Sequence, residues 1–308
     1  MTSIRTLLCI LALPWSLPAS AQERGSQTPA AARYIVPQSA LDSARNPKTI
    51  EEETGGRLGV ALVDADGRLL LGFNRDERFA MCSVFKAPLA AAILTGADSG
   101  KFGLDGQVSF TKSDILDFAP AVRKNAKRGR MSMAELAQAA VEVSDNSAAN
   151  LLLPMIGGPP GLTAFFRAHG DTVSRLDRTE PALNENKQGD DQDTSSPAAM
   201  AGLMGRLLLS HMEKDSAQKL RGWMVASRTG DARIRAGLPK GWTSGGKTGS
   251  CGTAFNDVAI VKSPGGDDYV LAIFLDRPTV DTKKAEAAIA EAARSALAFI
   301  AQAQKSGL

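Results

Sequence analysis

The chain has 308 residues, of which 44% are hydrophobic, so it can bury a sizeable core in one large domain or in two closely joined ones. Its formal net charge of +3 falls to +2 without residues 1–21, because Arg5 is the only charged residue among them. A charge this small gives no reason to expect nucleic acid or an anionic membrane as a partner.

The first 21 residues have the pattern of a secretory signal. Arg5 is followed by an apolar run over Leu7–Leu17 and then by Ala19-Ser20-Ala21, which has the A-x-A form of a cleavage site. No later apolar run is long enough to span a bilayer. The sequence therefore predicts removal of residues 1–21 and export to the periplasm.

Short elements are predicted after the signal. Residues 22–38 show no periodicity and are expected to form a loose N-terminal extension. A short helix is expected over Ser39–Glu53. The runs Arg57–Asp64 and Arg68–Asn74 flank Asp66-Gly67, which predicts a β-hairpin.

The middle of the chain, from about residue 81 to 225, is helical in pattern. A capping box at Ser132–Glu135 opens one helix, and Asn146–Met155 is expected to form the next. Ser144-Asp145-Asn146 is then placed at the corner between two helices. Residues 170–197 are rich in Asp, Asn, Gly and Pro, and a loop of this length is uncommon unless it is functional.

Strand patterns return near the end, at Thr243–Cys251, Phe255–Lys262 and Asp268–Asp276, and an amphipathic helix follows. Strands from both ends of the chain predict an α+β fold in which one five-stranded antiparallel sheet is flanked by terminal helices. An all-helical lobe is inserted, with the active site in the cleft between the lobes. The predicted α/β lobe covers 39–80 and 227–308, and the helical lobe covers 81–226 with an active-site loop at 177–194.

The tetrapeptide Ser83-Val84-Phe85-Lys86 is a candidate nucleophile motif. The same Ser-x-x-Lys pattern occurs at residues 216–219 and 244–247, so the pattern alone is weak. An apolar run over 87–94 places Ser83 at a helix start, with Lys86 on the same face. A lysine one turn away can activate the serine hydroxyl, which is a poor nucleophile by itself. The alternative is a capping serine beside a solvated lysine.

Ser144-Asp145-Asn146 is the second motif, and these residue types also favour ordinary turns and helix caps. In a catalytic site the Ser144 hydroxyl would relay a proton to a leaving nitrogen. The Asn146 amide would position both Lys86 and an acylamide side chain of a substrate. Asp145 is expected to fix the corner.

Lys247-Thr248-Gly249 is the third motif, in a strand predicted to border the cleft. The backbone N–H of Ser250 is placed to form an oxyanion hole with the N–H of Ser83. Thr248, Ser250 and Lys247 are expected to bind a substrate carboxylate. Gly249 suits a position where the backbone approaches a ligand closely. Without the other motifs, this segment is an ordinary exposed strand.

The long loop carries four polar residues that we interpret in pairs. Glu180 and Asn184 are four residues apart and are expected to hold one water for attack on an acyl-enzyme. Arg178 and Asp193 have opposite charge and bracket the loop, so a salt bridge between them would fix its shape. Charged loop residues are otherwise mostly solvated.

The chain has only two histidines and three cysteines, which limits the metal and disulfide sites it can form. His169 and His211 have no acidic or cysteine companions at metal-ligand spacing and stand near no nucleophile, so we expect no metal and helix-surface positions. Cys9 lies in the signal and follows Leu8, where a lipid anchor needs a small residue. This leaves Cys82 and Cys251, either as a disulfide favoured by an oxidising compartment or as two buried thiols.

Together these segments resemble the class A serine β-lactamases, and they follow one another at intervals of 61, 36 and 67 residues from Ser83 to Lys247. The resemblance implies that Ser83 is the nucleophile, with Lys86 its activator and Ser144 the proton relay. It assigns the deacylating water to Glu180 and Asn184. It leaves open whether Lys86 or Glu180 takes the proton in acylation.

The resemblance covers the chain from about Ser39 to the last helix. It implies a β-lactamase/transpeptidase-like fold and hydrolysis of penicillins, cephalosporins and carbapenems, hence antibiotic resistance. It further implies a monomer with β-lactam substrates and inhibitors as its partners and no cofactor.

A disulfide-containing, carbapenem-hydrolysing subgroup resembles this chain most in detail. By that resemblance Cys82 and Cys251 are bridged, and Arg233 assists in binding the substrate carboxylate. Phe118 stands where the family usually carries Tyr or Trp over the cleft mouth. Its ring can still stack on the substrate, but it lacks the hydroxyl of a Tyr. Gln192 replaces a common Arg before Asp193. These departures bear on substrate range more than on reaction type.

Two other functions share part of this pattern. A penicillin-binding D,D-peptidase has the first three motifs but not the water site of Glu180 and Asn184. A covalent β-lactam sensor binds without turnover and is normally joined to a membrane segment. The fate of the acyl-enzyme separates these functions from a hydrolase.

Overall fold

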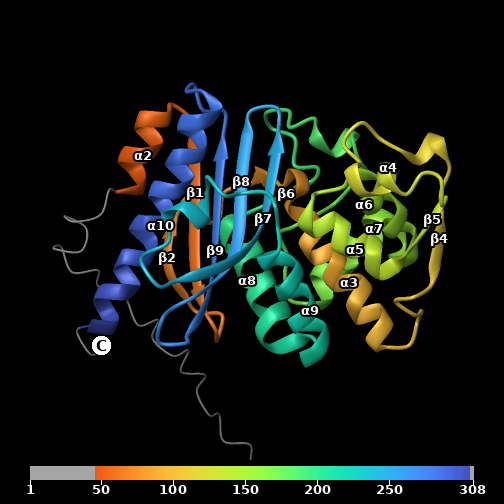
Figure 1. Ribbon diagram of the computed structural model, residues 1–308. Helices are drawn as coiled ribbons and strands as arrows, with labels where there is room; N and C mark the ends of the chain where they lie inside the picture. Colours follow the sequence, from red (N-terminus) through yellow and green to blue (C-terminus); the bar gives the residue numbers. More distant parts are fainter. Residues whose placement is uncertain (1–45, 306–308) are drawn as a thin grey trace, which may run out of the picture. The chain divides into compact units, whose positions relative to one another are not determined.

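The computed structural model describes residues 46–305, with side chains through residue 300 (Figure 1). The predicted signal, the N-terminal extension and residues 39–45 lie outside this range. The described part contains a five-stranded antiparallel sheet in the order β2-β1-β9-β8-β7. Its strands are β1 (Arg57–Asp64), β2 (Leu69–Phe73), β7 (Thr243–Cys251), β8 (Ala254–Lys262) and β9 (Asp268–Asp276). The predicted single sheet built from both ends of the chain is therefore confirmed.

The sheet is joined at its centre by the pairing of β1 with β9, which runs in continuous register from Arg57↔Asp276 to Asp64↔Tyr269. Six of the eight residues of β1 are buried in an uninterrupted run, because both faces of the sheet are covered. One face packs against α2 (Pro47–Thr54) and α10 (Thr282–Lys305), as Figure 1 shows. The other face packs against α8 (Pro197–Arg206).

Helix α2 is the first helix of the described residues, and it covers the later part of the helix predicted over Ser39–Glu53. Asn46 caps α2 by accepting a hydrogen bond from Lys48 N at 3.0 Å, and Pro47 takes the first helical position, where its missing N–H costs nothing. The helix ends at Gly55, whose φ of 63° is readily adopted by glycine. The start predicted at Ser39 lies outside the described residues.

Helices and short helical turns fill the segment between the two groups of sheet strands. The predicted capping box is present: Ser132 Oγ accepts from Glu135 N at 3.1 Å, and Glu135 Oε2 accepts from Ser132 N at 2.7 Å. The helix predicted over Asn146–Met155 passes into a 3₁₀ turn after Leu152, with Pro154 in that turn. The elements are η1 (Cys82–Phe85), α3 (Lys86–Asp98), η2 (Lys112–Asp114), α4 (Pro120–Lys124), α5 (Met133–Glu142), α6 (Asn146–Leu152), η3 (Leu153–Ile156), α7 (Gly158–Ala168), η4 (Ala182–Asn184), η5 (Leu207–His211), α9 (Lys214–Val225) and η6 (Ile234–Gly237).

Two short ladders were not predicted, because strands of two or three residues are too short to show a periodic pattern. β4 (Gln107–Ser109) pairs with β5 (Arg130–Ser132). β3 (Phe79–Ala80) pairs with β6 (Thr194–Ser195). The second ladder matters for the site, since it joins the end of the long loop to the segment that precedes Ser83. Within the described part, no helix has the length and apolar character needed to cross a membrane.

Candidate active site

Ser83 lies in the 3₁₀ turn η1, and Lys86 is the first residue of the helix that continues from it. Lys86 Nζ donates a hydrogen bond to Ser83 Oγ at 2.9 Å. Strand β7 packs directly against this turn. A Cβ on Gly249 would lie only 2.4 Å from the carbonyl oxygen of Met81, so no side chain fits between them. Glycine at this position therefore allows the third motif to approach the first.

Lys86 is fully buried and is the centre of a polar cluster. Its Nζ donates to Ser144 O at 2.9 Å and to Asn146 Oδ1 at 2.5 Å. It also forms an ion pair with Glu180 Oε1 at 3.1 Å. Burial lowers the pKa of the Lys86 ammonium, and the Glu180 carboxylate opposes that shift. The arrangement favours a lysine that can lose its proton more readily than an exposed one.

The corner between α5 and α6 has the conformation that presents Ser144 to two lysines. Ser144 has a φ of 57°, in the left-handed region. Its hydroxyl oxygen accepts from Lys247 Nζ at 3.0 Å and lies 3.4 Å from Lys86 Nζ. Asp145 holds the corner by accepting from Ala148 N at 2.9 Å and from Ala121 N at 2.8 Å. The expected structural role of Asp145 is confirmed.

Lys247 is also fully buried, on strand β7. Its ammonium donates to Thr248 O at 2.7 Å in addition to Ser144. Burial, and then repulsion by the charge of Lys86, hold the pKa of Lys247 well below its usual value. Thr248 Oγ1 donates to Thr229 Oγ1 at 2.8 Å, so Thr229 joins the group from outside the three motifs.

Arg233 is buried beneath the same strand and fixed by several acceptors. Its guanidinium donates to Ser250 Oγ and to Asn256 O, both at 2.7 Å. It also forms an ion pair with Glu286 of α10 at 3.1 Å. Ser250 itself is exposed, so the contact joins a buried cation to a hydroxyl that solvent and ligands can reach.

Glu180 is buried and is held by two asparagines. Asn184 Nδ2 donates to Glu180 Oε2 at 2.5 Å. Asn150 Nδ2 donates to Glu180 O at 2.8 Å, and Asn150 Oδ1 accepts from Glu180 N at 3.0 Å. In the described part of the chain, Glu180 Oε1 has only its ion pair with Lys86, and Asn184 Oδ1 has no hydrogen-bond partner. These two buried oxygens can accept hydrogen bonds from a small ligand.

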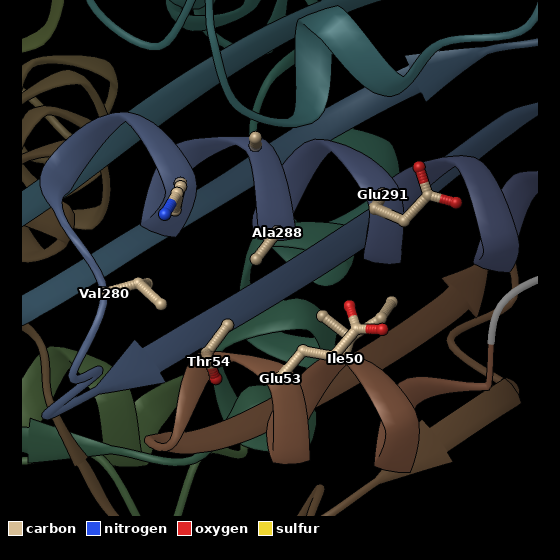
Figure 2. Close-up of a pocket in the computed structure, with 8 residues that line it drawn as sticks. Ile50, Glu53, Thr54, Val280, Ala288 and Glu291 are labelled. Carbon is tan, nitrogen blue, oxygen red and sulfur yellow. The ribbon is translucent and has the colours of Figure 1, made fainter.

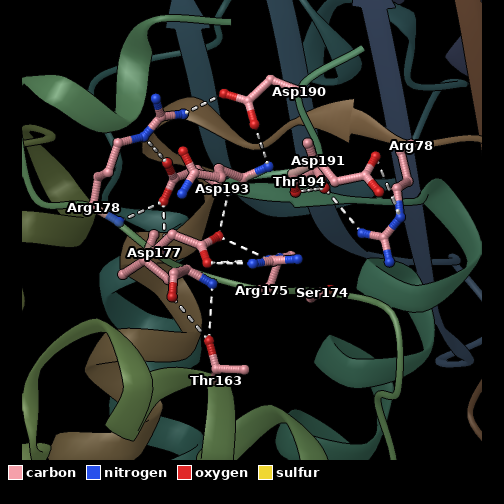
Figure 3. A network of polar contacts seen from close by, with 12 residues as sticks. Arg78, Thr163, Ser174, Arg175, Asp177, Arg178, Asp190, Asp191, Asp193 and Thr194 are labelled. Atoms are coloured by element: carbon pink, nitrogen blue, oxygen red, sulfur yellow. Dashed lines mark hydrogen bonds and ion pairs between the residues drawn. The ribbon is translucent and has the colours of Figure 1, made fainter.

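The loop that carries Glu180 is fixed by charged contacts around Asp193 (Figure 3). Arg178 Nε donates to Asp193 Oδ2 at 2.5 Å, and Asp193 Oδ1 accepts from the backbone N–H of Asp177 at 2.8 Å. The carbonyl oxygen of Asp193 accepts from Met81 N at 2.9 Å. One residue thereby ties the loop to the segment two residues before Ser83.

The predicted disulfide borders Ser83, and the Phe118 side chain is open to solvent. Cys82 and Cys251 form a disulfide with their Cα atoms 5.7 Å apart, and it joins η1 to the end of β7. Gly252 and Thr253 make a two-residue turn from β7 to β8. The Phe118 side chain is 56% exposed, and the carbonyl oxygen of Phe118 accepts from Asn146 N at 2.9 Å.

Asn150, Thr229 and Glu286 also belong to this group, and they were not predicted from the sequence. Asn150 follows Asn146 by one helical turn, so both side chains lie on one face of α6. This spacing could have identified Asn150 from the sequence. Thr229 and Glu286 lie in a loop and on the last helix, and nothing in their local sequence distinguishes them. Their positions depend on packing between distant segments.

Two other observations concern ligands. Among residues 46–300, no group of three or more His, Cys, Asp or Glu side chains is arranged to hold a metal ion. A cavity of about 290 Å³ lies between α2 and α10, lined by apolar side chains such as Ile50 and Val280 and by the carboxylates of Glu53 and Glu291 (Figure 2). This cavity contains none of the candidate catalytic residues.

Residues 43–300 match the model of the β-lactamase enzyme family. The chain is 41% identical over 260 residues to β-lactamase L2 of Stenotrophomonas maltophilia, covering 83% of this chain and 86% of the relative. It is 42% identical over 251 residues to a carbapenem-hydrolysing β-lactamase KPC of Klebsiella oxytoca, covering 80% of this chain and 85% of the relative.

Solved structures agree with these sequence matches. The structure of a class A β-lactamase described as the last common ancestor of Gram-negative bacteria superposes with a TM-score of 0.80 at 46% identity, covering 82% of this chain and 97% of that one. A β-lactamase from Xanthomonas campestris pv. campestris gives a TM-score of 0.80 at 44% identity, covering 82% and 96%.

Proposed function

The chain belongs to the class A β-lactamases, and on this premise we propose that Ser83 is the nucleophile that opens the β-lactam amide of penicillins, cephalosporins and carbapenems. The enzyme is then a serine β-lactamase that confers antibiotic resistance. The observation that carries the proposal is the position of Lys86 Nζ, which contacts Ser83, Ser144, Asn146 and Glu180 at once.

In acylation, Ser83 Oγ attacks the lactam carbonyl carbon and its proton passes to the buried pair of Lys86 and Glu180. The new bond joins Ser83 Oγ to the carbonyl carbon, and the bond from that carbon to the lactam nitrogen breaks. Ser144 gives its hydroxyl proton to the leaving nitrogen and is reprotonated from Lys86, whose Nζ lies 3.4 Å from Ser144 Oγ. The lowered pKa of Lys86 favours this proton transfer.

In deacylation, Glu180 takes a proton from a water molecule that attacks the ester carbonyl. Glu180 Oε1 and Asn184 Oδ1 are the two acceptors available to orient that water. The bond between Ser83 Oγ and the carbonyl carbon breaks, and the proton that Glu180 took from the water passes through Lys86 to Ser83 Oγ. This second step distinguishes a hydrolase from a penicillin-binding peptidase or a sensor. Both of those proteins keep the acyl group bound after they react with a β-lactam.

The substrate is oriented by the strand that borders Ser83. We assign the backbone N–H groups of Ser83 and Ser250 to the oxyanion hole. Lys247, Thr248 and Ser250 bind the substrate carboxylate, and Arg233 supports them through its 2.7 Å contact with Ser250 Oγ. Asn146 binds the acylamide side chain, and the exposed ring of Phe118 stacks on the substrate at the entrance.

Carbapenems belong to this substrate range for two reasons. The chain is similar to a relative whose name describes carbapenem hydrolysis. The Cys82–Cys251 disulfide also restrains the residue directly before the nucleophile. A restrained Ser83 keeps its distance to Lys86 while a bulky acyl group is bound.

We further propose that the enzyme acts as a monomer in the periplasm, after export directed by residues 1–21. The signal pattern of residues 1–21 supports export. Cell fractionation and gel filtration test these two points. A cytoplasmic enzyme with an uncleaved N-terminus, or a larger species in solution, would refute the corresponding point.

The function is tested by mixing purified protein with a penicillin and with a carbapenem, and following ring absorbance and intact mass together. A hydrolase consumes both compounds over many turnovers and returns to its unmodified mass. An adduct that persists on the unaltered protein without turnover would instead identify a sensor or a peptidase. Loss of turnover for the carbapenem alone would remove carbapenems from the substrate range.

A further inference from the structure

The two histidines of the chain meet in space, although they are 42 residues apart in the sequence. His169 caps the C-terminal end of α7, and His211 ends the π-helical turn η5 that continues α8. Their ring centroids are 5.6 Å apart, with the ring planes inclined at 40°. From the sequence, the two histidines are predicted as separate helix-surface residues, and no local pattern indicates that they are in contact.

The tautomer of His169 is fixed by its hydrogen bond. His169 Nδ1 lies 2.9 Å from the carbonyl oxygen of Phe165, which can only accept. Nδ1 therefore carries the proton, and the lone pair of the neutral ring is on Nε2. The Phe165 ring also packs against the imidazole at a centroid distance of 4.1 Å, which restricts its rotation. Backbone hydrogen bonding of this kind is typical of metal-binding histidines.

His211 is exposed and accessible from solvent. Partial burial, and then the nearby His169 and Arg206, lower the pKa of His211. A metal ion binds through the lone pair of a neutral imidazole.

The surroundings of the two histidines include both negative partial charge from helix ends and a positive side chain. Each histidine is at the carbonyl end of a helical segment, where the helix dipole favours a cation. Arg206 opposes a cation, because its guanidinium is close by and donates to His169 O at 2.6 Å. We therefore expect moderate rather than tight binding.

We propose that His169 and His211 form a binding site for a divalent transition-metal ion, such as Zn²⁺, Ni²⁺ or Cu²⁺, with one nitrogen ligand from each ring and water in the other positions. A metal about 2 Å from a ring nitrogen is roughly 3 Å from the ring centre, so two rings that share an ion have centroids roughly 5 Å apart at a tetrahedral angle and up to roughly 6 Å apart when the nitrogens lie on opposite sides of the ion. The observed 5.6 Å lies within that limit.

An ion at this site would clamp the end of α7 to the end of η5. Residue 170, directly after His169, begins the long loop that leads to Glu180. The ion would therefore stabilise the folded protein at the entrance of this loop, and its effect would grow with ion concentration. The site is separate from the reacting groups and requires no change in the hydrolytic mechanism.

The test uses untagged protein that has been freed of metal with a chelator and dialysed. Calorimetric titration with ZnCl₂ is compared among the wild type, His169→Gln, His211→Gln and the double variant, which contains no histidine and measures binding elsewhere. We expect one ion per chain, an affinity at least tenfold weaker in each single variant, and a metal-dependent rise in Tm in the wild type only. Wild-type affinity in either single variant would overturn the proposal.

Proton NMR of the unmutated protein provides a test that does not depend on the folding of variants. The chain has two histidines, so two imidazole C2–H signals are expected. Both should shift together and saturate at the same Zn²⁺ stoichiometry. A shift of one signal alone, or of neither, would refute a shared ion.

Discussion

Asn150 holds Glu180 by both polar atoms of its side-chain amide: Nδ2 donates to Glu180 O at 2.8 Å, and Oδ1 accepts from Glu180 N at 3.0 Å. Glu180, which we propose as the general base, is thus positioned by helix α6, which also carries Asn146. This contact leads to the first of five predictions.

Replacing Asn150 with Ala should slow deacylation more than acylation, so that a penicillin adduct accumulates. The change leaves a backbone donor and a backbone acceptor of Glu180 without their partner, which costs about 1–3 kcal/mol of stability. Stopped-flow absorbance and intact mass separate the two steps. Asn125→Ala is the matched control, because Asn125 Nδ2 also donates to a backbone oxygen, that of Ala121 at 2.9 Å, away from Glu180. Equal deacylation rates in both variants would contradict the positioning role.

Ser83→Ala and Glu180→Gln should fail at different steps. Without Ser83 Oγ no covalent bond can form, so both the adduct and hydrolysis should disappear. Without the Glu180 carboxylate, deacylation should slow by on the order of 10²–10⁴, the usual contribution of a general base, and the penicillin adduct should persist. Mass spectrometry during turnover distinguishes the two. Turnover of penicillin by Glu180→Gln at the wild-type rate would show that the water is activated elsewhere.

Glu286→Gln should weaken substrate binding through Arg233. The carboxylate of Glu286 lies 3.1 Å from the Arg233 guanidinium, and loss of its charge should cost about 1–2 kcal/mol, or about fivefold to thirtyfold in KM, with a small effect on kcat. Glu291→Gln removes a charge from the same helix and serves as control. If the KM values of the two variants agree, Glu286 does not position Arg233.

Cys82→Ser should destabilise the protein, because Cys82 and Cys251 close a loop of 169 residues. The loop-entropy model gives a contribution of up to about 5 kcal/mol. We expect a lower Tm and weaker carbapenem turnover. Reduction of the wild-type protein should lower its Tm toward that of the variant. An unchanged Tm of Cys82→Ser under oxidising conditions would contradict the prediction.

Asp257→Asn should change how stability depends on pH. Burial raises the pKa of Asp257 to about 6 from 3.8, with Arg233 and Lys247 opposing the shift. The folded state therefore binds the proton more tightly than the unfolded state. The stability this provides is fully present below pH 3.8 and is lost as pH rises through about 6.

The wild type should accordingly lose up to about 3 kcal/mol relative to Asp257→Asn between pH 4 and 7. The hydrogen bond from Ile234 N to Asp257 Oδ2, 3.1 Å long, can be kept by the Asn oxygen. Urea denaturation at several pH values measures the difference. Asp66→Asn, at an exposed position, is the control for a general charge effect. Parallel stability curves for the wild type and Asp257→Asn would contradict the shift.

Features that depend on neighbouring residues could be predicted from the sequence. The bounds of β1, β7 and β9 agree with the predicted strands, because long apolar runs and turn residues define them locally. The capping box at Ser132 and the corner at Asp145 follow from side-chain to backbone hydrogen bonds over three residues. The contact of Ser83 with Lys86 follows from their spacing on one helical face.

The tertiary structure alone decided which distant groups meet. Lys86 reaches Ser144 and Glu180 only because three segments fold around one buried space. Burial then lowers the pKa values of Lys86 and Lys247. Glu286 is beside Arg233, and His169 is beside His211, because separate helices pack together. Packing over long sequence distances depends on the shape of the whole core, and no local pattern records it. The sequence by itself therefore determined the chemical groups and their order, whereas their distances, burial and partners came from the fold.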